Sequence, residues 1–187
     1  MNVLPRTWET GRLVMSDGVL ADRPQFDAIA HACAYVGEWD PAFRVQAVDG
    51  GQPPARDEDL VAKSLGLVAR PDPRFRLQSI RLKLATTIIG YFHLYHATPT
   101  PQTIFLSMLI LHPDYQHQGF GQEVIAGLAH QLEHLGYTAI WLDVYLKNWP
   151  ALRFWISAGF TTIVEYDGDK RHADDAYALL VLEKKLG

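Results

Sequence analysis

The stretch Gln116-His117-Gln118-Gly119-Phe120-Gly121 decides how this chain is interpreted. It follows an apolar run that ends at Pro113 and precedes a segment with helical periodicity. A helix N-terminus presents backbone N–H groups without partners and a partial positive charge, so it favours phosphate. Glycines let a ligand approach the backbone because they have no Cβ, and two glycines one residue apart suit a diphosphate. The stretch predicts an anion-binding loop, with an ordinary tight strand-to-helix turn as the alternative.

Two other glycine-rich fingerprints fit this loop less well. A P-loop requires Gly-Lys followed by Ser or Thr, which the stretch lacks. A dinucleotide-binding GxGxxG pattern requires a small third residue where Val124 stands. Neither of these nucleotide-binding classes is therefore favoured.

The segments around the loop predict a single α/β domain over residues 1–187. After Pro113 the apolar positions follow a helical period from near Gly119 to the stop signal at Gly136. A second helix is expected from Trp149 to Ala158. Strand patterns recur along the rest of the chain, at Arg12–Leu20, Arg74–Leu84, Thr86–His96, Thr103–His112, Thr138–Leu146, Phe160–Tyr166 and Tyr177–Glu183. Further helices are predicted at Arg23–Val36 and Asp57–Leu65, with a loop at Trp39–Pro54 between them.

Composition limits the function classes. The chain has 187 residues, 48% of them hydrophobic and 20% charged, a formal net charge of -4 and a pI near 6.0. Nucleic-acid binding depends on clustered Lys and Arg, so we expect no such partner. Cys33 is the only cysteine and excludes an internal disulfide. No apolar run is long enough to span a membrane and Met1–Thr10 has no signal-peptide pattern, so we expect a cytoplasmic protein without a membrane partner.

Two ordered motifs resemble those of the GNAT N-acetyltransferases. The run Leu109–Gly121 is similar to motif A of that superfamily, including its Gln/Arg-x-x-Gly-x-Gly/Ala signature. Further on, a set of residues resembles the second motif on the coenzyme A side, namely Leu142-Asp143-Val144, Asn148, Ala151, Trp155 and Gly159-Phe160. The specific resemblance covers about Thr103–Phe160. It implies a mixed, centrally splayed β-sheet flanked by helices, the acyl-CoA N-acyltransferase fold.

The resemblance also implies a cofactor site for acetyl-CoA, used as a co-substrate without a metal. The backbone of Leu109, Ile110 and Leu111 would pair with the pantetheine arm. Gln116 would belong to the diphosphate loop, whose ligands are the amides of His117, Gln118, Gly119, Phe120, Gly121 and Gln122. Asn148 and Trp155 would complete the cofactor side, Trp155 by contact or only by packing beneath the slot.

The acceptor would be a primary amine of a small molecule or peptide, entering from the opposite side of the slot. Members of the family often build this pocket from the first helix and the following loop, which here contains Trp39 and Phe43. The same aromatics are equally consistent with a satellite of the core. The sequence leaves the oligomeric state open, a homodimer being one option.

An ammonium group must lose a proton before it attacks a thioester. Asp143 lies within an apolar strand, where desolvation raises the pKa of a carboxyl group and makes it a better base at neutral pH. The alternative is a structural carboxylate near the strand end, and Glu165 is a weaker candidate base. A backbone N–H near Leu111 would stabilise the oxyanion, as the resemblance implies.

The position four before Gly159 departs from the family pattern. Members of the family commonly carry there a Tyr that protonates the leaving thiolate, whereas Trp155 cannot supply a proton. Tyr145 is our candidate replacement, with Tyr115, His112, a water or an unprotonated thiolate as alternatives. The departure also motivates a second hypothesis, a module that binds acyl-CoA without catalysing transfer.

The run His130-Gln131-Leu132-Glu133-His134 literally matches the zinc-peptidase pattern HxxEH. Its two His can share a metal at this spacing. On a helical wheel, however, both project opposite the apolar stripe that includes Val124 and Leu128, which places them on the solvated face. A peptidase is therefore the remote alternative, with His130, Glu133 and His134 as its residues.

Overall fold

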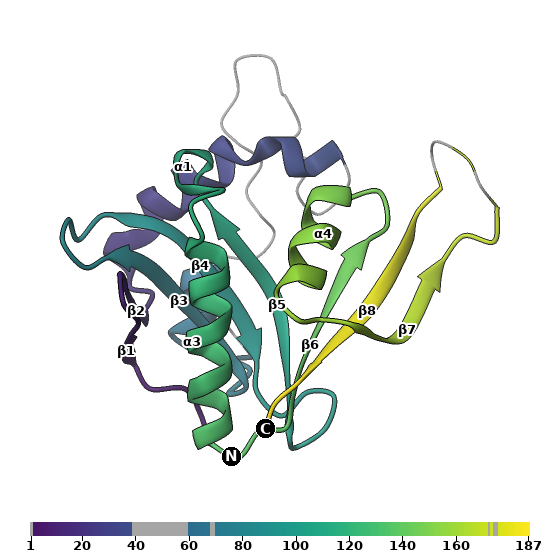
Figure 1. Ribbon diagram of the computed structural model, residues 1–187. Coiled ribbons are helices and arrows are strands. Elements are labelled where there is room, and N and C mark those ends of the chain that lie inside the picture. The colour runs from purple at the N-terminus through teal and green to yellow at the C-terminus, as the bar shows by residue number, and fades with distance from the viewer. Residues whose placement is uncertain (1, 39–59, 68–69, 172, 174–175) are drawn as a thin grey trace.

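The computed structural model describes residues 2–38, 60–67, 70–171, 173 and 176–187 (Figure 1). Within these described ranges, a single sheet of eight strands has the order β1-β2-β3-β4-β5-β6-β8-β7. The strands are β1 (Thr7–Glu9), β2 (Leu13–Asp17), β3 (Phe75–Leu82), β4 (Ile88–Tyr95), β5 (Thr103–Leu111), β6 (Ala139–Tyr145), β7 (Thr162–Gly168) and β8 (Ala178–Lys185). The helices are α1 (Arg23–Ala32), α2 (Leu60–Ser64), α3 (Phe120–His134) and α4 (Trp149–Ser157).

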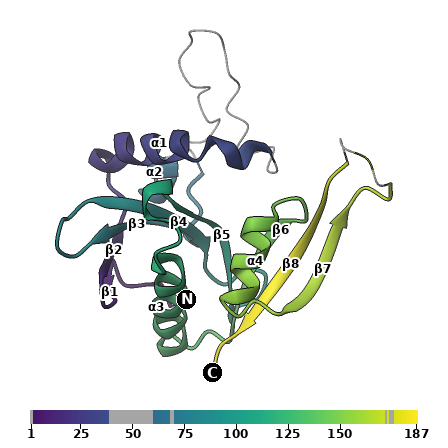
Figure 2. The same ribbon diagram turned by 45° about the horizontal axis from the view of Figure 1, so that its top comes forward.

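The helices cover the sheet on both faces, which gives three layers (Figure 2). Helices α3 and α4 pack on one face over the larger core cluster, while α1 and α2 pack on the other over a smaller one. Strand β4 shows the alternation behind this division, because Phe92 and Leu94 enter the larger cluster, while Tyr91 and Tyr95 pack with the smaller one. All strand pairs are antiparallel except β5 with β6, so the predicted mixed α/β sheet is confirmed.

Helix α3 follows the predicted period closely. Val124 and Leu132 are fully buried and Leu128 nearly so, which places the apolar stripe against the sheet. The helix begins after Gly119, whose φ of 79° is left-handed, and Gly136 follows its end with a φ of 83°. The glycines at the two ends of α3 therefore both have a positive φ.

The sheet splits between its two central strands. Parallel pairing of β5 with β6 is limited to Thr103–Ala139, Ile104–Ile140 and Phe105–Trp141. Beyond these pairs β5 runs on to Leu111 and β6 to Tyr145, and the two strands separate (Figure 1). A register shift in the β4–β5 ladder gives β5 an extra residue, Ser107, just past the last pair. The expected central splay is thus confirmed, and a bulge accompanies it, because bulges bend the strand that carries them.

Three parts of the chain differ from the sequence expectation or lie outside it. Strand β1 was not predicted, and the first helix ends at Ala32 and continues as a 3₁₀ turn, Ala34–Glu38. The predicted loop with Trp39 and Phe43 lies outside the described residues.

Among the helices that the structure describes, none combines the length and the apolar character needed to cross a membrane.

Candidate functional site

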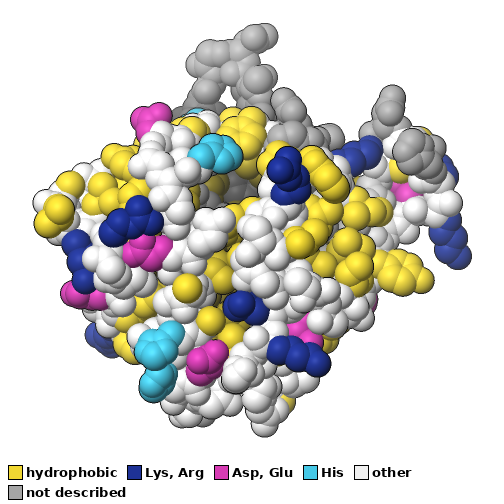
Figure 3. Space-filling model, viewed as in Figure 1, with side chains coloured by type: hydrophobic (Ala, Val, Ile, Leu, Met, Phe, Trp, Pro, Cys, Tyr) yellow, Lys and Arg dark blue, Asp and Glu magenta, His cyan; other side chains and the backbone are white. Residues whose placement is uncertain are grey.

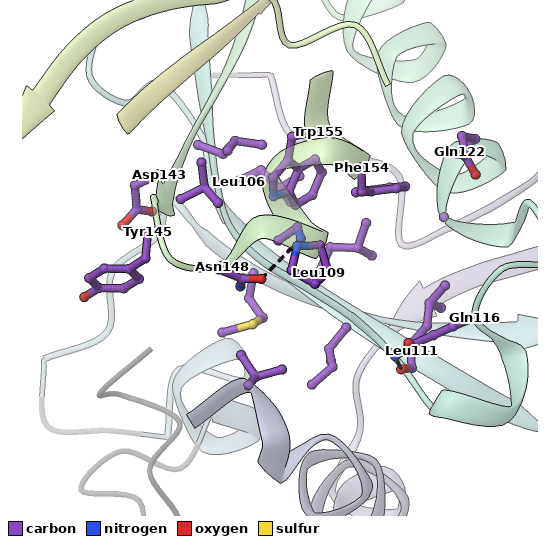
Figure 4. Close-up of a pocket in the computed structure, with 18 of the residues that line it drawn as sticks. Leu106, Leu109, Leu111, Gln116, Gln122, Asp143, Tyr145, Asn148, Phe154 and Trp155 are labelled. Carbon is purple, nitrogen blue, oxygen red and sulfur yellow. Dashed lines mark hydrogen bonds between the residues drawn. The ribbon is translucent and has the colours of Figure 1, made fainter. Parts of the chain in front are cut away.

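A cavity of about 340 Å³ occupies the gap between β5 and β6 (Figure 4). One wall is the end of β5 and the loop before α3, and the other is the end of β6 with the start of α4. The lining includes Leu109, Ile110, Leu111, Gln116, His117, Gly119, Gly121, Gln122, Asp143, Tyr145, Asn148 and Trp155. Residues predicted from two separate motifs therefore meet around one cavity.

The edge of β5 offers backbone groups to this cavity. The amide of His112 donates to the carbonyl oxygen of Ile89 at 2.8 Å, so His112 pairs with the strand preceding β5. Backbone polar groups alternate in direction along an antiparallel pair, so those of Leu111 and Leu109 point the other way, toward the gap. Leu109 is thus placed to hydrogen-bond an extended ligand as a strand would, and Leu111 offers its amide to the same gap.

The loop before α3 has an unusual backbone path. His117 has a φ of 59° and Gly119 a φ of 79°. In the described part of the chain, no backbone or side-chain oxygen accepts a hydrogen bond from the amides of residues 117–122. A Cβ at Gly121 would lie 2.9 Å from Cε2 of Phe154, so only glycine lets α3 begin this close to α4. The result is a concave set of amide donors at a helix N-terminus, a geometry that fits a phosphate group.

The side chain of Gln116 ties this loop to the opposite layer. Its amide nitrogen donates to the carbonyl oxygen of Leu111 at 2.8 Å and to the Tyr35 hydroxyl at 2.9 Å. The Cys33 thiol donates to the same carbonyl at 3.3 Å, and burial raises the pKa of Cys33 to about 11, so the thiol keeps its proton. Desolvation likewise raises the pKa of Tyr35, with a smaller opposing effect from its hydrogen bond to Gln116. The sequence predicted that Gln116 belongs to the diphosphate loop, but it did not predict these hydrogen bonds to Leu111 and Tyr35.

On the β6 side, Asn148 and Trp155 belong to α4. The Asn148 side-chain oxygen accepts from the amide of Ala151 at 3.2 Å and caps the helix (Figure 4). Trp155 is buried and packs edge-on against Phe154 and Phe160, at ring-centroid distances of 4.8 and 5.3 Å. Both residues line the cavity, and both also hold the local structure together.

Asp143 and Tyr145 share one face of β6, two residues apart (Figure 4). Asp143 is exposed overall, which differs from the desolvated position expected of a residue within an apolar strand. Its carboxyl group is nevertheless desolvated enough to raise its pKa above the ordinary value of 3.8, the direction that the sequence predicted. Tyr145 packs edge-on with Tyr177 of the neighbouring chain segment at 6.3 Å.

Other candidates lie away from the cavity lining. Glu165 is exposed on β7, an edge strand of the sheet. Neither His112 nor Tyr115 lines the cavity. The side chain of His112 instead accepts a hydrogen bond from the amide of Asp114 at 3.3 Å.

The HxxEH residues lie on the outer side of α3. His130 and His134 are both exposed, as the wheel predicted, with their rings 4.3 Å apart. The His134 ring is 2.8 Å from the carbonyl oxygen of His130, at hydrogen-bonding distance. Within residues 2–38, 60–67, 70–171, 173 and 176–187, no group of three His, Cys, Asp or Glu side chains could hold a metal ion.

Sequence reasoning missed several residues of the lining. Tyr35 and Val36 come from the 3₁₀ turn after α1, far from either motif, and no local pattern marks them. Ser107, Met108 and Phe154 lie inside or beside the motifs. The alternation of β5 could have indicated the first two, had the bulge at Ser107 been foreseen.

Comparisons with known proteins agree with this geometry. A ribosomal protein bS18-alanine N-acetyltransferase of Escherichia coli K12 is 40% identical over 48 residues, which are 26% of this chain and 32% of that enzyme. The matched region therefore spans about a third of the length of the curated relative.

Solved structures share the fold. An acetyltransferase of Thermus thermophilus has a TM-score of 0.60 at 23% identity, over 96% of this chain and 100% of that one. A Vibrio cholerae spermidine N-acetyltransferase in complex with CoA and spermine has a TM-score of 0.67 at 13% identity, over 93% and 95%. Residues 34–160 match the family described as Acetyltransferase (GNAT) family. Since that match takes in both motifs and both walls of the cavity, this chain belongs to the GNAT acetyltransferase family.

Proposed function

We propose that this protein is a single-domain, cytoplasmic enzyme that transfers an acetyl group from acetyl-CoA directly to a primary amine of a small molecule or peptide. The observation that carries the proposal is the cavity between β5 and β6. It has the amide donors of the loop before α3 at one end and the Asp143 carboxyl group at the other. Family membership supports acetyl-CoA as the donor, and the net charge of -4 supports an acceptor other than nucleic acid.

The cofactor half would work through the backbone. Amides of residues 117–122 would hold the diphosphate, where the partial positive charge of α3 favours an anion. Leu109 would pair with an amide of the pantetheine arm, because its polar groups face the gap, whereas the Leu111 carbonyl already accepts from Gln116 and Cys33. Bound acetyl-CoA supplies a thioester, an acetyl group already activated for transfer. Coordination by a metal is not needed for this chemistry.

The acceptor half would supply the base. Asp143 would take a proton from the ammonium group, directly or through a water, because its raised pKa makes it a stronger base than an ordinary Asp. The amine nitrogen then forms a bond to the carbonyl carbon, and the bond from that carbon to sulfur breaks. The amide of Leu111 would donate to the carbonyl oxygen as negative charge develops on it.

Tyr145 would donate a proton to the leaving thiolate, and the surplus proton on the nitrogen of the new amide would pass to the tyrosinate, directly or through a water. The phenol lines the cavity, whereas the other two side chains considered for this role, Tyr115 and His112, do not. A donor of this kind matters because Trp155 stands at the position that commonly carries a Tyr in the family. Trp155 would then act by packing, since it is buried between two other aromatic rings.

The test is release of free thiol from acetyl-CoA by the purified protein across a panel of acceptors. The named relatives act on an alanine residue of a ribosomal protein and on spermidine, so the panel should hold N-terminal peptides and polyamines, with aminoglycosides and amino acids added. We expect turnover with at least one primary amine and none with its N-acetylated form. Product mass should increase by one acetyl group.

Trp155 favours one second candidate, a module that binds acyl-CoA without catalysis. Thermal melts separate the two. Coenzyme A at 100 times its dissociation constant should stabilise either protein by about 2.7 kcal/mol, but only the enzyme should release thiol. A melting curve that coenzyme A leaves unchanged would contradict both candidates.

A further inference from the structure

Arg12 lies outside both motifs but reaches the anion loop. It is in the turn between β1 and β2, and its backbone carbonyl accepts from the amide of Lys83 at 3.0 Å. Its side chain extends to the N-terminus of α3, where Nη1 donates to the carbonyl oxygen of Gln118 at 3.1 Å. The guanidinium carbon lies 4.2 Å from the centroid of the Phe120 ring. A cation is thus held against two residues of the predicted diphosphate loop.

Glu123 fixes the position of this cation. Nε of Arg12 donates to Oε2 of Glu123 at 2.6 Å, and the Arg12 amide donates to Oε1 at 2.7 Å. The Thr10 hydroxyl donates to Oε1 at 2.6 Å, so both carboxylate oxygens are engaged. These hydrogen bonds, together with the Arg12 charge, outweigh the effect of burial and lower the pKa of Glu123. The Glu123 side chain is largely covered, at 18% exposed, whereas that of Arg12 is 50% exposed.

The remaining nitrogen of Arg12 lies beside the loop, although Arg12 is not itself among the residues that line the cavity. A Cβ built on Gly119 would lie 3.5 Å from Nη2, so this nitrogen stands beside the glycine that keeps the loop open. Among the described residues that line the cavity, none is Lys or Arg. A diphosphate carries more negative charge than the partial positive charge of one helix terminus can balance.

We propose that Arg12 is a further cofactor-binding residue, whose Nη2 donates to the diphosphate of coenzyme A, and that Glu123 is its positioning residue. The inference rests on the proposed function, since it concerns the same cofactor. The Phe120 ring explains why an aromatic residue suits the middle of the loop, because it supports the guanidinium from below. The fork of Arg suits an anion that is already held by backbone amides.

The experiment is calorimetric titration of coenzyme A, dephospho-coenzyme A and pantetheine into the wild type and Arg12→Gln. Loss of a charge-assisted hydrogen bond should raise the dissociation constant for coenzyme A roughly tenfold or more. Dephospho-coenzyme A keeps the diphosphate and should lose affinity to the same extent, while pantetheine should bind both proteins equally. Lys170→Gln removes an exposed cation from the β7–β8 connection and should change none of these values.

The double variant Arg12→Gln with Glu123→Gln tests whether Arg12 touches the ligand. If Arg12 contacts the diphosphate, the double variant stays as weak as Arg12→Gln. Recovery of wild-type affinity would overturn the proposal, because Arg12 would then only neutralise Glu123. An equal affinity of wild type and Arg12→Gln, or a loss confined to coenzyme A with its additional phosphate, would overturn it too. A wild type that binds no coenzyme A would instead refute the proposed function.

Discussion

The two walls of the cavity are built by different means. The β5 wall consists of backbone groups held by glycines, by the Gln116 side chain and by the Cys33 thiol. The β6 wall consists of side chains on alternate positions of one strand, Asp143 and Tyr145, together with the cap and core residues of α4. One wall presents hydrogen-bond donors whose identity hardly depends on side chains, and the other presents titratable groups.

This difference separates binding from chemistry. A backbone wall can hold the same phosphate and amide groups in many proteins, so its sequence signature is short and strict. A side-chain wall can change its substrate by exchanging a few residues, so its signature is loose. On the face shown in Figure 3, exposed apolar side chains gather over α4 and the β7–β8 hairpin, beside the side-chain wall. Among the described residues of these elements, the large exposed apolar side chains are Trp149, Ile156, Ile163, Tyr166 and Tyr177.

Asp143→Asn should produce the largest effect and confine it to the β6 wall. Losing a general base should lower kcat about a hundredfold or more, with the dissociation constant of coenzyme A unchanged. In the wild type, kcat should fall as the pH drops through the Asp143 pKa, which lies above 3.8, and this limb should be lost in the variant. Steady-state rates across a pH series and calorimetry measure the two quantities.

The stability of Asp143→Asn provides its control. The folded protein raises the Asp143 pKa, so it binds that proton more tightly than the unfolded chain does, and ionisation above this pKa costs stability. Asn carries no charge, so at neutral pH the variant should melt at the same or a higher temperature than the wild type. A marked drop in melting temperature would point to a structural carboxylate instead of a base.

Gly119→Val should break the opposite wall. A β-branched residue is strained at a φ of 79°, and its side chain would stand in the amide cradle. The shift of about 5 to 10 °C expected with coenzyme A at 100 times its dissociation constant should disappear. Gly136→Val is the matched control, because Gly136 ends the same helix with a φ of 83° and has open space around it. Both variants should lose comparable stability, and only Gly119→Val should lose the ligand response.

Tyr145→Phe should lower kcat by about tenfold, less than Asp143→Asn, because proton donation to a thiolate assists a group that already leaves readily. Coenzyme A affinity should stay the same. An acetyl thioester with a more acidic thiol should reduce the difference between variant and wild type. If the difference were equally large with that donor, Tyr145 would not be the proton donor.

Gln116→Ala and Tyr35→Phe test the connection between the layers and should give the smallest effects. Gln116→Ala removes one restraint on the Leu111 carbonyl, which should weaken coenzyme A binding by roughly two- to tenfold, the value of one hydrogen bond. Tyr35→Phe removes only the hydroxyl that Gln116 holds and should change it less. Calorimetric titration measures both effects. If Tyr35→Phe weakened coenzyme A binding more than Gln116→Ala, the Tyr35 hydroxyl would matter more for binding than the restraint on the Leu111 carbonyl.

Much of the fold followed from periodicity and punctuation. The period through Val124, Leu128 and Leu132 predicted α3, and the glycines on either side of it gave its ends. Strand β1 was missed because three residues with one buried side chain carry no period. The position of Tyr35 was missed for another reason, since its place in the lining depends on how the turn after α1 crosses the end of β5, a tertiary contact.

The parts of the candidate site that depend on backbone conformation could be predicted from the sequence, and the parts that depend on tertiary contacts could not. Gly119 and Gly121 indicated the loop. Gly119 has a positive φ and Gly121 lies against the Phe154 ring, and both conditions favour glycine over other residues. Arg12 was not foreseen, because a cation 106 residues away from Gln118 in sequence gives no local sign of its contact. The raised pKa of Asp143 was predicted, whereas its exposure was not, because the number of neighbours over a strand face is set by the whole fold.

The short pairing of Thr103, Ile104 and Phe105 with β6 affects how firmly the two halves of the sheet are held together. Among the described residues, the backbone ladder between the half-sheets β1–β5 and β6–β8 has three residue pairs, extended by one hydrogen bond from the amide of Thr138 to the carbonyl oxygen of Gln102 at 2.9 Å. A ligand in the gap that hydrogen-bonds to both strands would extend that ladder. Ligand binding would then also complete the hydrogen bonding between the two half-sheets. A bound ligand would therefore hold the two half-sheets together more firmly. The protein without ligand would be the more easily deformed of the two, because fewer backbone hydrogen bonds join its half-sheets.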